Sequence, residues 1–138
     1  MPQERMSSAE FRALNQQPAR SRKAKHDYKA DFIQQLQLAG LPAPRTEFRF
    51  ARPQRQWRLD FAWVGESVAV EYQGGVYDEG KSGHTTVRGF SRDCLKFSEA
   101  AIRGWMLILI TADMVRSGEA LQLIERALKV RQAEKESD

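Results

Sequence analysis

The segment 56–75 constrains the fold most, because it has the pattern of two β-strands joined by a tight turn. Large apolar residues occupy every second position of both halves: Trp57, Leu59, Phe61, Trp63, Val68, Val70 and Tyr72. A period of two is typical of half-buried strands. Gly65 and Glu66 stand where a two-residue hairpin loop belongs, and a glycine in the first central position favours a type II′ turn.

This turn predicts a register for the hairpin. If Val64 lies across the loop from Ser67, then Asp60 lies directly opposite Glu71. Directly opposed residues share a face of the sheet, with Cβ atoms roughly 4.5–5.5 Å apart. A slip of one residue would place the two acids on opposite faces. The register therefore predicts a pair of neighbouring carboxylates.

Two carboxylates at such a distance repel by about 3 kcal/mol at an effective dielectric near 20. A divalent cation between them converts this repulsion into chelation, because hard cations prefer carboxylate oxygens. We therefore predict a magnesium- or manganese-type site at Asp60 and Glu71. The alternative is a polar face on which both acids are solvated or paired with Arg58 and Lys96.

Composition limits the classes that remain. The chain has 138 residues, which suits one domain with its own core. A single cysteine, Cys94, excludes a disulfide framework within a monomer, and we interpret it as a small buried apolar residue. The sequence contains no apolar run of the length of a membrane span and no signal-peptide core, so we expect a cytoplasmic protein that binds no membrane.

The remaining periodicities predict an α/β fold with a mixed four-stranded sheet flanked by helices, in the order α-β-β-β-α-β-α. We expect a helix over 27–38, a strand over 46–51, a long loop over 74–89, a helix over 90–103, a buried strand over 105–110 parallel to its neighbour, and a last helix over 120–128. The first helix has an apolar stripe of Tyr28, Phe32, Leu36 and Leu38. We divide the chain into a flexible basic arm (1–26), one domain (27–132) and a charged tail (133–138).

The helix over 90–103 has apolar residues at helical spacing, and we expect Phe90, Cys94, Phe97 and Ala101 to face the core. Asp93 and Lys96 lie at the edge of that stripe, from which their side chains would point into a cleft. The strand after this helix is apolar throughout, which predicts burial on both of its faces.

Positive charge is concentrated in the first part of the chain. Of the net charge of +4, residues 1–60 contribute 12 Lys and Arg against 6 Asp and Glu, so the rest of the chain is slightly acidic. A basic region beside an acidic pair suits an enzyme that acts on a phosphodiester backbone, although such residues can also simply solubilise a surface. The candidates for contact with nucleic acid are Arg22, Lys23, Lys25, Arg49, Arg52, Arg55, Arg58, Lys81 and Arg88.

Four short motifs follow one another in this pattern of elements: 58–61 (Arg-Leu-Asp-Phe), 70–74 (Val-Glu-Tyr-Gln-Gly), 93–96 (Asp-Cys-Leu-Lys) and 104–105 (Gly-Trp). Together they resemble the PD-(D/E)XK nuclease superfamily, and most closely its very-short-patch-repair-type endonucleases and their relatives. The resemblance covers roughly residues 28–128. It implies a restriction-endonuclease-like core and hydrolysis of DNA phosphodiester bonds.

The resemblance also implies the metal ligands. Asp60, Glu71 and the main-chain carbonyl of the next residue, Tyr72, would hold one or two Mg²⁺ or Mn²⁺ ions. Such ions polarise the phosphoryl oxygen and lower the pKa of a bound water. The repair endonucleases also carry a structural zinc, but one cysteine and two histidines argue against it here.

Gln73 stands where the superfamily usually has a lysine that orients or activates the attacking water. A glutamine can hydrogen-bond a water but cannot take its proton. Two residues can replace the missing lysine: Lys96, which can bring a positive charge from the helix, and His84 on the loop, which can act as a base or bind phosphate.

These observations favour a metal-dependent DNA endonuclease acting in repair, recombination or phage DNA processing, with a homodimer as the usual means of cutting both strands. The alternative is a catalytically inactive nuclease-fold protein that binds DNA or RNA, because Gln73 replaces the lysine. A domain with no role in nucleic-acid chemistry is the third interpretation.

Overall fold

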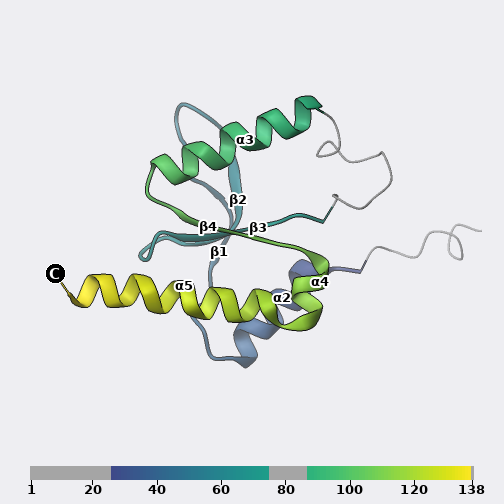
Figure 1. Cartoon of the computed structure of the whole chain (residues 1–138), viewed down its shortest axis with the longest axis vertical. Coiled ribbons are helices and arrows are strands. Elements are labelled where there is room, and N and C mark those ends of the chain that lie inside the picture. Colours follow the sequence, from purple (N-terminus) through teal and green to yellow (C-terminus); the bar gives the residue numbers. More distant parts are fainter. Residues whose placement is uncertain (1–25, 75–86, 138) are drawn as a thin grey trace, which may run out of the picture.

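The computed structural model describes residues 26–74 and 87–137, and these form three layers (Figure 1). The elements, in chain order, are α2 (Tyr28–Leu38), β1 (Arg45–Arg49), β2 (Arg58–Trp63), β3 (Val68–Tyr72), α3 (Val87–Ile102), β4 (Met106–Ile110), α4 (Ala112–Ser117) and α5 (Glu119–Glu136). The arm residues Arg22, Lys23 and Lys25, and the loop residues Lys81 and His84, lie outside the described residues.

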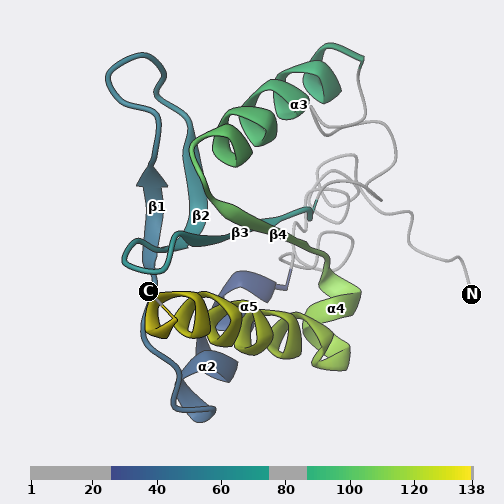
Figure 2. The ribbon, with the colours of Figure 1, turned by 60° about the vertical axis from the view of Figure 1, so that its left-hand side comes forward.

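A four-stranded sheet in the order β1-β2-β3-β4 forms the middle layer. The pairs β1–β2 and β2–β3 are antiparallel, and β3–β4 is parallel. Helix α3 covers one face, and α2, α4 and α5 lie on the other (Figures 1 and 2). The predicted mixed sheet, the order of elements and the parallel crossover through α3 are confirmed, and the short helix α4 before the last helix is an addition to the predicted order.

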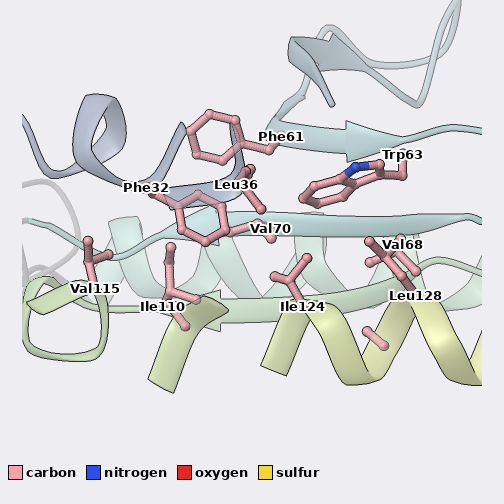
Figure 3. Close-up of a cluster of buried hydrophobic side chains, with 12 residues drawn as sticks. Phe32, Leu36, Phe61, Trp63, Val68, Val70, Ile110, Val115, Ile124 and Leu128 are labelled. Carbon is pink, nitrogen blue, oxygen red and sulfur yellow. The ribbon is translucent and has the colours of Figure 1, made fainter. Parts of the chain in front are cut away.

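The main core fills the space between the sheet and the helices α2 and α5 (Figure 3). Phe32 and Leu36 of α2 meet Phe61 of β2, and Ile124 of α5 lies across from Val70 of β3. These side chains are almost completely buried. A second, smaller cluster on the α3 side is built around Leu59, Ala62, Ala69 and Ala100. Four of its six buried members are alanines, since Phe50 and Ala51 also belong to it, so burial contributes less on this side of the sheet.

Helix α2 begins and ends as the sequence indicates. The Asp27 side chain accepts a hydrogen bond from the Ala30 amide at 3.0 Å, which caps the amino end. Gly40, just past the end, has a φ of 70°, the left-handed conformation that glycine favours. The prediction that Leu38 belongs to the apolar stripe is wrong, because its side chain is 82% exposed. Leu38 follows Leu36 by two residues and therefore lies on the other side of the helix.

The hairpin has the predicted register but a different turn. Phe61 pairs with Val70 and Trp63 with Val68, as expected. The Ser67 amide donates to the Val64 carbonyl at 3.2 Å, and Ser67 has a φ of 54°. The described glycines with positive φ do not include Gly65, so the turn is not type II′. A four-residue loop that places its left-handed residue last keeps the same pairing, since the register depends on loop length and not on which residue is left-handed.

Helix α3 is rotated about its axis relative to the prediction. Phe90 is 65% exposed, and Cys94 and Ala101 are exposed, while Gly89 and Ala100 are buried. The expectation that Phe90, Cys94 and Ala101 face the core, and that Cys94 is buried, is therefore wrong. The face turned inward is the one that carries Lys96. The ammonium group of Lys96 forms an ion pair with Glu71 of β3, which explains the rotation.

Strands β1 and β4 form the two edges of the sheet. The expectation that the apolar run 105–110 is buried on both faces is wrong, because Leu109 is 45% exposed and only Ile110 of β4 is fully buried. An edge position leaves part of the strand uncovered even when its sequence is apolar. At the other end of the chain, α5 continues into the charged segment as far as Glu136. Among the described helices, none is long and apolar enough to cross a membrane.

Candidate functional site

The candidate site lies where β2 begins and β3 ends, just beyond the last ladder pair, Phe61 with Val70. Here the two acids clamp the strands together by reciprocal bonds between side chain and main chain. The Asp60 amide donates to Glu71 Oε1 at 2.8 Å, and the Tyr72 amide donates to Asp60 Oδ2 at 2.8 Å. The hairpin therefore brings the two carboxylates together, as the register predicts.

Each carboxylate offers its other oxygen to a lysine. Lys96 Nζ of α3 donates to Glu71 Oε2 at 3.0 Å, and Lys29 Nζ of α2 donates to Asp60 Oδ1 at 2.9 Å. The two helices lie on opposite faces of the sheet (Figure 2), so the ammonium groups approach the acids from opposite layers. Lys96 therefore reaches the acid pair from α3, as predicted. The partner of Asp60 is Lys29 and not Arg58.

Burial and charge change how these groups titrate. Burial raises the pKa of Glu71 above its ordinary value of 4.5, the neighbouring charge of Asp60 raises it further, and Lys96 opposes both effects. Burial by itself would lower the pKa of Lys29, but the hydrogen bond to Asp60 and the charges of Asp60, Glu47 and Glu71 outweigh it and raise that pKa. At neutral pH, Lys29 is therefore firmly protonated.

The donor set fits one hard divalent cation. Each carboxylate oxygen has two lone pairs, and among the described residues each of the four oxygens accepts one hydrogen bond, which leaves capacity for a metal. Within the described ranges, no group of three or more Asp, Glu, His or Cys residues is arranged to hold a metal ion. Asp60 and Glu71 would thus supply two side-chain ligands, and the remaining ligands would have to come from main chain, water or substrate.

Gln73 follows directly after the acid-bearing strand. The main-chain N–H of Gln73 donates to the Ile110 carbonyl at 2.7 Å, which holds the end of β3 against β4. Within the part of the chain that the structure describes, its Nε2 is buried and makes no hydrogen bond. A buried N–H donor without a partner is costly, so such a group is a candidate for binding a water or a substrate oxygen.

Four of the arginines predicted to contact nucleic acid, Arg49, Arg52, Arg55 and Arg58, lie in or beside the loop between β1 and β2, which rises beside α3 (Figure 2). Arg49 and Arg58 are direct partners across the two strands, and Arg49 Nη1 donates to Gln56 Oε1 at 2.9 Å. The Arg55 guanidinium lies 5.0 Å from the centre of the Trp57 ring. Two like charges directly opposite one another are unfavourable, so an anion beside Arg49 and Arg58 would reduce their repulsion. Arg52 and Arg88 are exposed.

Sequence reasoning missed two charged residues of the site, Lys29 and Glu47. Lys29 Nζ also lies 3.8 Å from Glu47 Oε1. The neighbouring pairs Thr46 with Phe61 and Phe48 with Leu59 place Glu47 across from Asp60. The register between β1 and β2 could have indicated Glu47, but this register depends on a long loop whose geometry the sequence does not fix. Nothing in the local sequence shows that Lys29 faces the acids.

A mixed four-stranded sheet with helices on both faces, in this order, is a nuclease-like α/β fold. The catalytic domain of the homing endonuclease I-Bth0305I shares it, with a TM-score of 0.58 over 78% of this chain and 98% of that domain. The two sequences are 19% identical, so the similarity establishes a common fold. No protein-family model matches the chain, and a comparison with curated proteins finds no match.

Proposed function

We propose that this chain is a divalent-metal-dependent DNA endonuclease of the PD-(D/E)XK type, similar to very-short-patch-repair-type enzymes. The observation that carries the proposal is the pair of mutually clamped carboxylates, Asp60 and Glu71, at the sheet end of a fold shared with a homing endonuclease catalytic domain. Mg²⁺ or Mn²⁺ held there would polarise the scissile phosphate and supply an activated water. The Tyr72 carbonyl is the proposed third protein ligand.

The residues around the acids have distinct proposed roles. Lys96 compensates the charge of Glu71 and keeps its carboxylate oriented, in place of the lysine that Gln73 replaces. Gln73 Nε2 can donate a hydrogen bond to the attacking water or to a phosphate oxygen. His84 is the proposed base. Arg49, Arg52, Arg55, Arg58 and Arg88, with Arg22, Lys23, Lys25 and Lys81, are the proposed contacts to the DNA backbone, where forked guanidinium groups suit phosphate.

We also propose that the protein consists of a basic arm (1–26) that follows the DNA backbone and one nuclease domain (27–132), forms a homodimer for cutting both strands, and is located in the cytoplasm. The proposed role is in DNA repair, recombination or phage DNA processing.

The test is cleavage of a panel of DNA structures by the full chain with Mg²⁺, Mn²⁺ or a chelator. The informative variants are Asp60→Asn and Glu71→Gln, because their amide oxygens can still accept from the Tyr72 and Asp60 amides, so the clamp survives. Glu119→Gln, an exposed acid at the start of α5, is the matched control. We expect metal-dependent cleavage that both site variants lose and the control keeps. Undiminished cleavage by Asp60→Asn would reject the proposal.

One observation favours a second candidate, a nuclease-fold protein that binds nucleic acid without cutting it. Every oxygen of the acid pair already accepts a hydrogen bond, two of them from lysines, and position 73 lacks a basic side chain. This candidate predicts salt-sensitive DNA binding with no product under any metal. It also predicts that Asp60→Asn, which removes a negative charge, leaves binding intact or strengthens it.

A further inference from the structure

The acid pair is part of a longer row of charges. Glu47 of β1, Asp60 of β2 and Glu71 of β3 follow one another across three neighbouring strands. Lys29 Nζ is hydrogen-bonded to Asp60 Oδ1 at 2.9 Å and lies 3.8 Å from Glu47 Oε1. A cation supplied by the chain itself therefore stands between two of the three carboxylates.

The Lys29 ammonium group lies on the opposite side of Asp60 from Glu71. A cavity of about 310 Å³ opens here, lined by Lys29, Glu47, Asp60 and the amino end of α2. The stem of Lys29 is held by its helix, which the Asp27 cap fixes at its first turn. The ammonium group thus occupies a position where carboxylates from two strands converge, which is the kind of place where a second divalent ion of a two-metal site would be bound.

The net charge of the row also favours a single divalent ion. The ion pairs of the row join three carboxylates to two ammonium groups, Lys29 and Lys96, for a net charge of −1. One divalent ion changes this to +1, whereas two would bring it to +3 in a partly buried site. Without Lys29 the row would carry −2, so one divalent ion would bring it to 0 and a second ion would raise it only to +2, not to +3. The row with Lys29 in place is suited to a single divalent ion.

We propose that Lys29 is a built-in substitute for a second metal ion, so that this protein binds one divalent cation at Asp60 and Glu71 and keeps Glu47 out of the ligand set. The inference rests on the proposed metal-dependent function. Lys29 is a positioning residue: its ammonium fixes Asp60 Oδ1 and supplies a permanent positive charge on the Glu47 side of the site. The site would then hold one exchangeable metal ion and one permanent ammonium charge.

The test is the number of Mn²⁺ ions bound per full chain, measured by isothermal titration calorimetry and by the loss of the free-Mn²⁺ paramagnetic resonance signal. We expect one ion for the wild type and two for Lys29→Met, because the variant frees Asp60 Oδ1 and Glu47. Adding Glu47→Gln to Lys29→Met should return the number to one. Lys29→Arg keeps the charge and should bind one ion, and so should Lys129→Met, an exposed lysine of α5 that serves as the matched control.

The outcomes separate the two proposals. Two ions in the wild type, or one ion in a folded Lys29→Met, would overturn the inference while leaving a metal-dependent nuclease intact. No ion in the wild type would reject the metal site itself and the proposed function with it. Circular dichroism shows whether each variant is folded. If Lys29→Met does not fold, Lys29→Gln, which keeps a polar side chain at this half-exposed position, replaces it with the same expectation.

Discussion

Removing the ammonium group of Lys96 tests how strongly the buried Glu71 depends on it. The Glu71 side chain is only 9% exposed and that of Lys96 only 17%, so water can replace little of their 3.0 Å contact. Lys96→Met keeps the length of the side chain and removes its charge. A buried carboxylate that loses its partner is strongly destabilising, by about 3–5 kcal/mol, unless it takes up a proton.

Protonation limits this cost, and the limit depends on pH. The pKa of Glu71 is already raised above 4.5 by burial and by Asp60, so the folded protein holds its proton more firmly than the unfolded chain does. The free energy of unfolding therefore falls as the pH rises from the unfolded pKa through the raised folded pKa, and it stays lower above that range. Without Lys96, which opposes the rise, the pKa is higher still and the fall continues to higher pH.

The size of this pH-dependent loss follows from the free energy needed to protonate Glu71. Protonating a carboxylate whose unfolded pKa is near 4.5 costs about 1.4 kcal/mol for each pH unit above that value, or about 3.4 kcal/mol at pH 7 and under about 1 kcal/mol at pH 5. We expect Lys96→Met to lose up to about 2.7 kcal/mol more stability at pH 7 than at pH 5. Loss of the contact with the Phe97 ring, 5.9 Å from Nζ, adds a part that does not change with pH.

The assay is urea unfolding followed by tryptophan fluorescence at both pH values, with a chelator present. Arg92→Met, an exposed residue of the same helix, is the control and should change stability little at either pH. Combining Lys96→Met with Glu71→Gln should remove the pH dependence, because the titrating group is gone. A loss for Lys96→Met that is equal at pH 5 and pH 7 would refute the reasoning, since it would assign the whole effect to packing.

Two further predictions concern the fold. Gly118, between α4 and α5, has a φ of 84° with open space where a Cβ would stand, so Gly118→Ala should cost about 1–2 kcal/mol of unfolding free energy through backbone strain alone. Gly65→Ala is its control, because Gly65 is not left-handed, and equal losses in urea unfolding would contradict the assignment. Cys94 is exposed, so it should react with a disulfide reagent in the folded protein at nearly the rate seen in urea; protection until unfolding would show that α3 is rotated differently.

The sequence alone determined the sheet and the acid pair. The alternation of 57–63 and 68–72 predicts two strands, and a short loop leaves few ways to pair them, so Asp60 and Glu71 were expected to meet. The expectation that these strands are half-buried is wrong, because Ala62 and Ala69 are buried on the α3 side as well. The helix ends at Asp27 and Gly40 follow from equally local chemistry, namely a capping carboxylate and a left-handed glycine. In each case the interacting residues are close in sequence.

Only the tertiary structure decided which face of α3 is turned inward and which cation reaches Asp60. The sequence of α3 offers two faces, one carrying Phe90 and Cys94 and the other Lys96, and hydrophobicity favours the first. The structure takes the second, because Lys96 meets the buried Glu71 while the alanine-rich side of the sheet gives large apolar residues little to pack against. Lys29 reaches Asp60 across 31 residues of sequence. Such contacts depend on how whole layers are stacked, which no local spacing encodes.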